Sequence, residues 1–345
     1  MPHKNLTKEL VSRTNNLSFF KYIGVLPNPD KVLSRGGKNY QNLRNLKNDP
    51  HLWACIQSRK SGVISKQYQL VQGNASSEVF DFVNLCFENI DAKRLIKQIL
   101  DAILFGFQPI EIIWKEKIFT KNVLEKNILF VIDKLESRPQ EYFVFDNNSV
   151  LKYISISDSR GKKMPKYKCL LVQHEADYDN PYGQSLLSKC YWSCTFKNSA
   201  IRFWVNFIER FGNPVVIANT ESILSEIEQQ KLLDSLAEMQ ESNTIVASGN
   251  VSVQIHDSAK QGNMLLYKEL INICNAEISK VVLSQTLTTE IEQGSYAASK
   301  THFEIRKEVI ESDMALVKRA MDTLIRYICE LNFGDIEVPT FEFIS

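Results

Sequence analysis

Residues 180–214 read NPYGQSLLSKCYWSCTFKNSAIRFWVNFIERFGNP, and this stretch decides the prediction of the fold. Its apolar side chains recur at steps of three, four or seven residues, which is typical of one face of an α-helix. They are Leu187, Cys190, Cys194, Ile201, Trp204, Ile208 and Phe211. Gly212-Asn213-Pro214 is a stop signal, because glycine readily ends a helix and proline cannot continue one. The pattern predicts one long helix over residues 187–211.

Two further long helices are predicted in the C-terminal part of the chain. One covers residues 264–283, and the other shows strict three-four spacing of apolar residues. This spacing is carried by Ile310, Met314, Val317, Met321, Leu324, Ile328 and Leu331. A helix of about 28 residues is about 42 Å long, which is long for a compact enzyme. Such helices suit a subunit that lies beside copies of itself around an axis.

Short β-type runs precede the long helices, at residues 110–118, 128–135, 142–146, 150–157 and 166–174. Asn147-Asn148 and residues 158–161 are turn sequences, so antiparallel hairpins are expected. Two more strands are predicted at residues 244–248 and 251–256, joined by Gly249-Asn250. Residues 1–48 are polar and basic and predict an irregular arm. Together these elements predict an α+β fold.

The composition is that of a globular protein, with 44% hydrophobic and 23% charged residues in a chain of 345. A net charge of +1 argues against a broad basic groove for nucleic acid. The seven cysteines form no CxxC pair, which indicates buried thiols in a reducing compartment. We expect neither a secretory signal nor a membrane span, because no apolar run is long enough for either.

No motif of a known catalytic class is present. The chain contains no GxxxxGK[ST], GxSxG or HExxH sequence. His174, Glu175 and Asp177, with Asp179 nearby, could supply metal ligands or an acid/base pair, which leaves a metal-dependent nuclease as an alternative. A polar turn is the favoured interpretation of these residues. We therefore predict no catalytic, cofactor-binding or metal-binding residue.

Two polar segments are candidates for binding. Residues 160–168 concentrate five cations, namely Arg160, Lys162, Lys163, Lys166 and Lys168. They could contact phosphates or an acidic partner, and a solvated loop explains them equally well. Residues 284–295 are polar and rich in threonine, and they are longer than the usual helix–helix connection of about 2–8 residues.

Three blocks of sequence resemble the portal proteins of Mu-like tailed bacteriophages. The first is residues 49–60, DPHLWACIQSRK, and the second is the stretch 180–214. The third is ISKVVLSQTLTTE at residues 278–290, followed by GSYAA at residues 294–298. Ser284 stands where the family pattern has glycine. The family usually continues beyond the length seen here, so a C-terminal crown is expected to be short or missing.

This resemblance implies a phage portal fold with a wing, long stem helices and a β-hairpin clip. The implied divisions are an arm (1–48), wing parts (49–117 and 214–284), hairpins including the clip (118–182), a stem helix (183–213), a channel loop (285–298) and a C-terminal helix and strand (299–345). The five cations would be partner contacts in the clip. The residues implied to face DNA are Gln285, Thr286, Thr288, Thr289, Gln293 and Ser295.

The resemblance also implies a function without catalysis or cofactor. Such proteins form a ring, usually of twelve copies, at one capsid vertex of the virion, and the ring is assembled in the bacterial cytoplasm. Implied partners are the terminase large subunit, a head–tail adaptor, a capsid or scaffold protein, and double-stranded DNA that slides through. A polar, weakly charged channel suits sliding, because strong cationic contacts to phosphate would slow it. A non-ring adaptor or prophage interaction protein is the main alternative.

Overall fold

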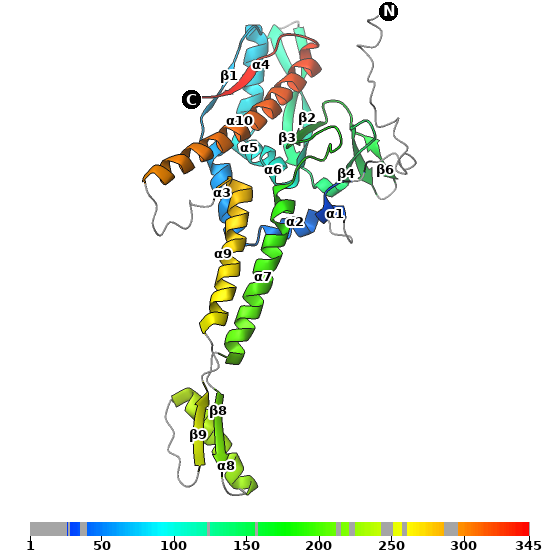
Figure 1. The fold of residues 1–345 in the computed structure, drawn as a ribbon. Helices are drawn as coiled ribbons and strands as arrows, with labels where there is room; N and C mark the ends of the chain where they lie inside the picture. Colours follow the sequence, from blue (N-terminus) through cyan, green and yellow to red (C-terminus); the bar gives the residue numbers. More distant parts are fainter. Residues whose placement is uncertain are drawn as a thin grey trace, which may run out of the picture. The chain divides into compact units, whose positions relative to one another are not determined.

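The computed structural model describes residues 26, 28–34, 40–122, 125–155, 158–211, 215–220, 225–242, 251–256, 261–285 and 296–344 (Figure 1). Helices and sheets are both present, which confirms the predicted α+β class. The chain divides into two compact units. Unit 1 comprises Met1–Tyr191 and Glu277–Ser345, and unit 2 comprises Trp192–Ala276. No described helix is both long and apolar enough to cross a membrane.

Unit 1 begins with short helices and ends with a long one. Its helices are α1 (Lys31–Ser34), α2 (Tyr40–Leu46), α3 (Pro50–Ile64), α4 (Ser77–Glu88), α5 (Ala92–Ile99), α6 (Asp101–Phe105), the 3-10 helix η4 (Gln140–Tyr142) and α10 (Tyr296–Phe333). Asp49 caps α3 by accepting the amide of Leu52 at 2.9 Å, with proline at the first helical position. Helix α2 buries Leu43, so the predicted arm is helical and partly buried in its last part.

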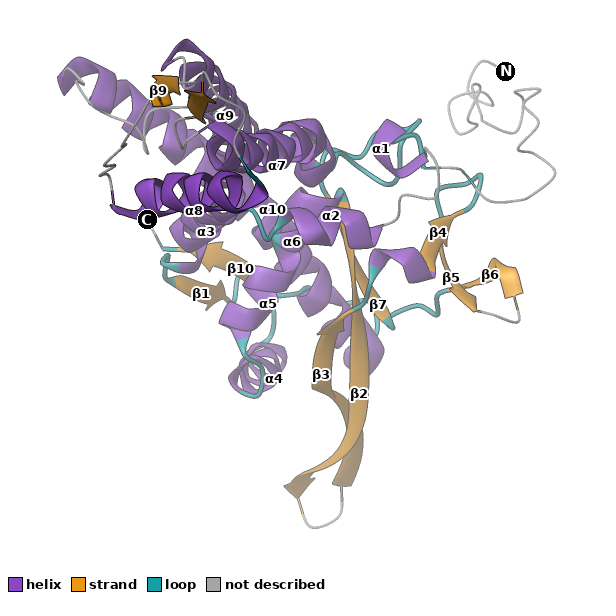
Figure 2. Cartoon of the chain, turned by 90° about the horizontal axis from the view of Figure 1, so that it is seen from below, coloured by secondary structure: helices purple, strands orange, loops and turns teal. Residues whose placement is uncertain are grey.

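Three small antiparallel sheets complete unit 1. Their strands are β1 (Tyr68–Val71), β2 (Phe107–Asn122), β3 (Glu125–Ser137), β4 (Phe143–Phe145), β5 (Leu151–Ser155), β6 (Asp158–Lys163), β7 (Cys169–Gln173) and β10 (Thr340–Phe343). The orders are β1-β10, β3-β2-β7 and β4-β5-β6. Strands are confirmed at the predicted runs 110–118 and 128–135. Strands β2 and β3 run side by side as one long ribbon (Figure 2), a pairing that the sequence did not assign.

The predicted turn at residues 158–161 is wrong. These residues belong to β6, because Ser155 pairs directly with Asp158 across a shorter connection. Arg160, Lys162 and Lys163 therefore lie on a strand at the edge of the β4-β5-β6 sheet rather than in a loop tip. An edge strand rich in cations resists pairing with foreign strands.

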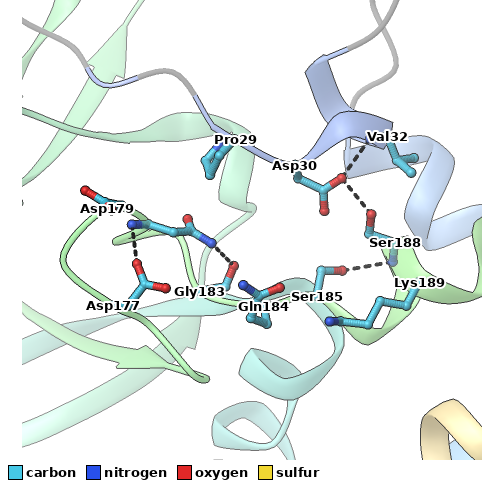
Figure 3. A pocket seen from close by; sticks show the side chains of 11 residues that line it. Pro29, Asp30, Val32, Asp177, Asp179, Gly183, Gln184, Ser185, Ser188 and Lys189 are labelled. Atoms are coloured by element: carbon cyan, nitrogen blue, oxygen red, sulfur yellow. Dashed lines mark hydrogen bonds between the residues drawn. The ribbon is translucent and has the colours of Figure 1, made fainter.

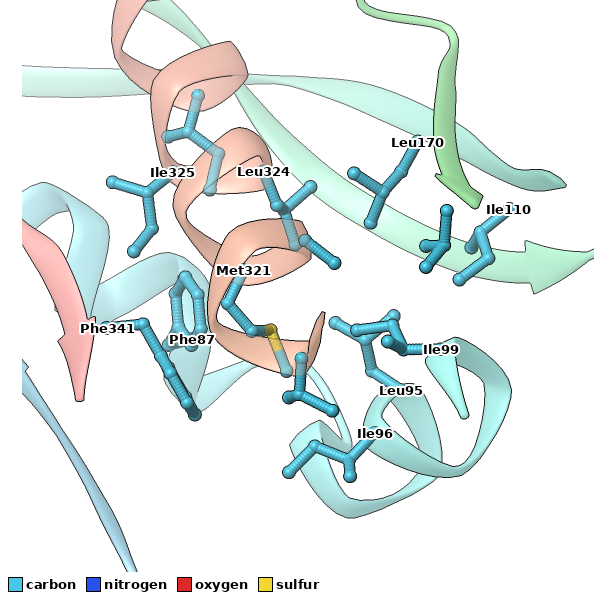
Figure 4. Packing of buried hydrophobic residues seen from close by; sticks show 14 of the residues in the cluster. Phe87, Leu95, Ile96, Ile99, Ile110, Leu170, Met321, Leu324, Ile325 and Phe341 are labelled. Carbon is cyan, nitrogen blue, oxygen red and sulfur yellow. The ribbon is translucent and has the colours of Figure 1, made fainter. Parts of the chain in front are cut away.

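Helix α10 organises the core of unit 1. Its predicted stripe is confirmed: Val317, Met321, Leu324 and Ile328 are all fully buried. Figure 4 shows this face of α10 lying between residues of other elements, including Leu95, Ile99, Ile110, Leu170 and Phe341. All seven cysteines are buried, as predicted.

Unit 2 contains the remaining elements. Helix α7 (Leu186–Phe211) enters it and α9 (Gln261–Leu283) leaves it, with β8 (Val215–Thr220), α8 (Glu226–Ser242) and β9 (Val251–His256) between them. The long helix expected at 187–211 is confirmed by α7. Strand β9 confirms the strand predicted at residues 251–256, and it pairs with β8. The other predicted strand, at residues 244–248, lies outside the described part of the chain. Residues 215–256 belong to unit 2, and residues 49–117 belong to unit 1.

Candidate functional site

The sequence NPYGQS at residues 180–185 forms a rigid backbone corner before α7. The side chain of Asn180 donates to the carbonyl of Gly183 at 2.8 Å and accepts the amide of Tyr182 at 3.2 Å. Gly183 has φ 71°, and a Cβ atom there would collide with the backbone oxygens of Gly106 and His174. Only glycine fits such a position without strain. The NPYGQS motif therefore has a structural role, because it fixes the point at which α7 begins.

Polar side chains tie this corner to the N-terminal arm. Ser185 donates to the carbonyl of Leu104 at 2.7 Å and accepts the amide of Ser188 at 3.1 Å. Ser188 in turn donates to Asp30 at 2.6 Å (Figure 3). The hydroxyl of Tyr182 donates to the carbonyl of Leu26 at 2.7 Å, and burial raises its pKa. The arm is thus fixed to the first turn of α7 by hydrogen bonds.

A cavity of about 390 Å³ lies beside this corner (Figure 3). Its lining includes Asp30, Asp177 and Asp179. Asp30 also accepts the amide of Val32 at 2.8 Å, and Asp177 accepts the amide of Asn180 at 2.7 Å. These carboxylates hold turns together, which is a common use of aspartate in loops.

The residues of the nuclease alternative are held as a polar turn. The Nδ1 atom of His174 lies 2.8 Å from the carbonyl of Gln184, so Nδ1 carries a proton in this contact. Glu175 has φ 47°, as expected for a turn residue. Within the described ranges, no three His, Cys, Asp or Glu side chains gather in a way that could hold a metal ion. The geometry favours the turn interpretation.

The structure separates the five cations of the 160–168 segment. Lys166 pairs with Glu330 at 3.1 Å, and hydrogen bonds to Tyr167 and Glu330 raise its pKa. Lys168 lies 3.6 Å from Glu111. These two lysines thus lie beside carboxylates of unit 1, at partly exposed positions.

Strand β6 contains the other three cations, Arg160, Lys162 and Lys163. The side chains of Lys162 and Lys163 are exposed, and neither forms an ion pair with a described carboxylate. The structure therefore leaves Lys162 and Lys163 available to an outside partner.

Of the residues expected to face DNA, only Gln285 is described, and it is buried directly after α9. Thr286, Thr288, Thr289, Gln293 and Ser295 lie outside the described residues. Ser284 adopts φ 57°, a conformation in which glycine is favoured, and this accounts for glycine in the family pattern.

Sequence reasoning missed a buried ion pair between α3 and α10, whose arginine also contacts the end of α9. Arg59 of α3 contacts both carboxylate oxygens of Asp313 in α10 at 2.8 Å. Its third contact, also at 2.8 Å, is the carbonyl of Val282 near the end of α9. The sequence signal for this ion pair is Asp313, a carboxylate that lies among the apolar residues of the 310–331 stripe.

In unit 2, α7 and α9 expose large apolar side chains. On α7 these are Trp192, Phe196, Ile201, Phe203, Val205 and Ile208, and on α9 they are Leu265, Leu266, Leu270 and Ile273. Phe203 is 62% exposed and Leu266 is 68% exposed. The two helices contact each other through Phe207 and Tyr267, whose ring centroids are 6.0 Å apart. Ile201 and Ile208, which belong to the predicted apolar stripe of this helix, are thus exposed in the described subunit.

Comparison with known proteins identifies a family and two curated relatives. The sequence matches the family described as "Portal protein of Mu bacteriophage" over residues 40–345. It is 23% identical over 316 residues to the Mu-like prophage FluMu protein gp29 of Haemophilus influenzae, covering 86% of this chain and 58% of that protein. It is 25% identical over 138 residues to the portal protein of Escherichia phage Mu, covering 39% and 27%. The matched part of the chain therefore corresponds to 58% of the length of the Haemophilus influenzae protein and to 27% of the length of the phage Mu portal protein.

The fold is similar to chains in solved particle necks. One is from the neck of an empty gene transfer agent particle, with a TM-score of 0.62 at 10% identity, covering 90% of this chain and 85% of that one. Another, from the neck of the native particle with C12 symmetry, has a TM-score of 0.58 at 11% identity, covering 88% and 83%. These matches show that the chain shares the fold of these neck chains. Because the family match extends over most of the sequence, the chain belongs to this family of Mu-type phage portal proteins.

Proposed function

We propose that this chain is a portal subunit that assembles with copies of itself into a ring at one capsid vertex of a virion. The ring, of twelve copies, is the passage for double-stranded DNA without sequence specificity. It also docks the terminase large subunit, a head–tail adaptor and a capsid or scaffold protein. The ring is assembled in the bacterial cytoplasm, and it performs no catalytic step of its own. Family membership and the shared portal fold support this proposal.

The observation that carries the proposal is the uncovered apolar surface of α7 and α9. A soluble monomer rarely exposes a contiguous apolar patch larger than a few hundred Å². Ten large apolar side chains are exposed on these two helices within unit 2. Association with neighbours would remove them from water, and each fully buried side chain contributes about 1.5–3 kcal/mol.

The remaining assignments follow from what each segment offers. Helices α7 and α9 would form the stem, and residues 285–298 would narrow the channel with polar side chains. Thr and Gln side chains form short-lived hydrogen bonds with phosphate, which suits sliding DNA. Lys162 and Lys163, with Arg160 beside them on β6, would contact a partner. Lys166 and Lys168 are already paired within unit 1, so we assign them a weaker role in docking.

The test is the state of the purified chain in solution. Mass photometry and negative-stain microscopy should show closed rings of about twelve subunits with a central hole. Monomers at high concentration would contradict the ring and favour a non-ring adaptor. Plasmid DNA incubated with the protein and Mg²⁺ should remain intact. Cleavage that is abolished by Asp177→Ala would overturn the non-catalytic function.

A further inference from the structure

Strand β7 leaves one edge of its sheet unpaired. The sheet order is β3-β2-β7, so only one side of β7 is bonded to another strand. On that side, the amide of Ile112 donates to the carbonyl of Lys168 at 2.9 Å, and the amide of His174 donates to the carbonyl of Gly106 at 2.8 Å. Because backbone groups alternate between the two sides of a strand, the even-numbered residues of β7 face β2 and the odd-numbered residues face outward.

The outward backbone groups belong to Cys169, Leu171 and Gln173. Within the described part of the chain, no hydrogen bond reaches their N–H or C=O groups from the side opposite β2. The opposite edge of the same sheet is protected, because Asn332 bonds both backbone groups of Phe130. The sequence of β7, CLLVQ, contains neither a charged residue nor a proline, which are the usual means of blocking an edge. The edge of β7 is therefore a template for one more strand.

A groove of about 400 Å³ lies between β7 and α10, and we call it the β7 groove. None of its lining residues belongs to β2, so it lies on the unpaired side of β7. Its lining combines residues of β7 with residues that follow at four and three positions on one side of α10, namely Leu171, Val172, Gln173, Leu316, Ala320 and Thr323. Leu316 and Ala320 are each 6% exposed and belong to the apolar core of unit 1. A strand added to β7 at about 4.8 Å would direct every second side chain toward α10.

The N-terminal arm joins unit 1 beside the end of β7. The amide of Leu26 donates to the carbonyl of Phe145 at 2.8 Å, and its carbonyl accepts the hydroxyl of Tyr182 at 2.7 Å. Pro181, the neighbour of Tyr182, accepts a hydrogen bond from the side chain of Gln173 at 2.6 Å. Gln173 is the last residue of β7. The arm therefore meets the fold close to the C-terminal end of the unpaired edge.

Residues 1–25, which lie outside the described part of the chain, contain one segment suited to this edge. Residues 17–23 read LSFFKYI, in which phenylalanine, tyrosine and isoleucine favour strands, whereas residues 1–16 are mostly polar. The extended segment from Leu17 to Val25 would span about 30 Å. Five residues, about 17 Å, match the five residues of β7, and residues 22–25 remain for the path to Leu26.

We propose that residues 17–21 of the arm add a fourth strand to the β3-β2-β7 sheet and fill the β7 groove of their own subunit. The added strand is parallel to β7, because the arm leads toward Leu26 and so toward the C-terminal end of β7. Phe19 and Phe20 are adjacent, so one of them faces α10 in either register. The tether to Leu26 holds the segment at a local concentration in the millimolar range, so weak strand pairing is sufficient. This inference does not depend on the proposed ring.

Amide hydrogen exchange in the full chain tests the pairing residue by residue. The comparison is with a variant that carries Phe19→Pro and Phe20→Pro, because proline donates no backbone hydrogen bond and disrupts strand pairing. The outward amides of Leu171 and Gln173 should exchange at least tenfold more slowly in the unchanged chain than in this variant. The amide of Val172 faces β2 and should stay equally protected in both proteins, which provides an internal reference.

A matched control places the same change elsewhere in the arm. The variant with Lys8→Pro and Glu9→Pro alters the polar part of the arm and should exchange like the unchanged chain at Leu171 and Gln173. Circular dichroism and melting temperature should show unit 1 folded in all three proteins, since none of the substitutions falls within its core.

Cross-linking identifies the chain that supplies the strand. Phe20→Cys with Thr323→Cys places one thiol in the arm and one in the β7 groove, while the seven native cysteines are buried. A short bismaleimide should join the two new thiols within one chain, as shown by digests of mixed ¹⁵N-labelled and unlabelled protein. Lys8→Cys with Thr323→Cys is the control and should give at least tenfold less product.

Three results would overturn the inference. Links between labelled and unlabelled chains would assign the β7 groove to the arm of another copy. Equal exchange at Leu171 and Gln173 in the unchanged chain and the arm-proline variant would show that the arm does not cover this edge. Equal cross-linking from Lys8→Cys and Phe20→Cys would show that the groove does not select residues 17–21.

Discussion

Asn332 of α10 pairs its side-chain amide with both backbone groups of Phe130 in β3. The amide of Phe130 donates to Oδ1 at 2.6 Å, and Nδ2 donates to the carbonyl of Phe130 at 2.9 Å. Strand β3 is at the edge of its sheet, so these backbone groups face away from β2. One asparagine therefore occupies the position that a further strand would take, which protects an exposed edge.

Asn332→Ala should destabilise unit 1 by about 1–3 kcal/mol, because it leaves two half-buried backbone groups without these partners. Urea unfolding followed by circular dichroism measures the loss. Arg326→Ala, at an exposed position of the same helix, is the control and should change stability by less than about 0.5 kcal/mol. Equal effects of the two substitutions would show that the Asn332 contacts do not stabilise the fold.

Asp313→Ala should be among the most damaging single substitutions in the chain. The substitution removes the carboxylate that pairs with Arg59. Because the side chain of Asp313 is only 3% exposed and that of Arg59 only 12%, the guanidinium of Arg59 is left as a buried charge without this carboxylate. The expected cost is about 3–5 kcal/mol. The double substitution Arg59→Met with Asp313→Leu should recover most of this loss in urea unfolding, since it leaves no unpaired charge. A double variant as unstable as Asp313→Ala alone would argue against this explanation.

Gly183→Ala and Gly73→Ala form a matched pair of substitutions. Both glycines have positive φ, 71° and 57°, so alanine is strained at each by about 1 kcal/mol. Only at Gly183 does the new methyl group also meet backbone atoms, whereas nothing lies within 4 Å at Gly73. Thermal unfolding should therefore show a clearly larger loss for Gly183→Ala. Similar losses would mean that the corner relaxes around a methyl group.

The contact between Arg44 and Glu141 should depend on pH. The carboxylate is partly desolvated, which opposes ionisation, but two hydrogen bonds from Arg44 at 2.9 and 2.6 Å prevail and lower its pKa. A lowered pKa means that the contact stabilises the fold above the ordinary value of 4.5 and stops doing so as the pH falls through the lowered value. A double-mutant cycle with Arg44→Met and Glu141→Gln should give favourable coupling at pH 7 and almost none at pH 2. Unchanged coupling at pH 2 would rule out the charged contact as its source.

Local patterns in the sequence were sufficient for the long helices and for the turn between β4 and β5. The apolar steps and the Gly-Asn-Pro stop predicted α7, and three-four spacing predicted the buried face of α10. These signals work because helix periodicity, capping and turn chemistry act between residues close in the chain. The Asn147-Asn148 turn likewise predicted the pairing of β4 with β5.

Pairing over longer distances was not predictable in this way. Strand β9 pairs with β8, which lies on the other side of helix α8 in the sequence and to which the sequence patterns assigned no strand. Lys166 and Lys168 looked like part of one exposed cluster, but Glu330 and Glu111 approach them from distant parts of the chain. Such contacts depend on which segments the fold brings together, and no local propensity records that.

The sequence by itself determined the family, the α+β class, the long helices and the glycine that the corner before α7 requires. Only the tertiary structure decided which apolar stripes are core and which are surface. Val317 and Phe203 both lie on helical stripes, but one is fully buried and the other is 62% exposed. The physical reason is that an apolar side chain carries the same periodic signal whether its own chain or a neighbouring copy covers it.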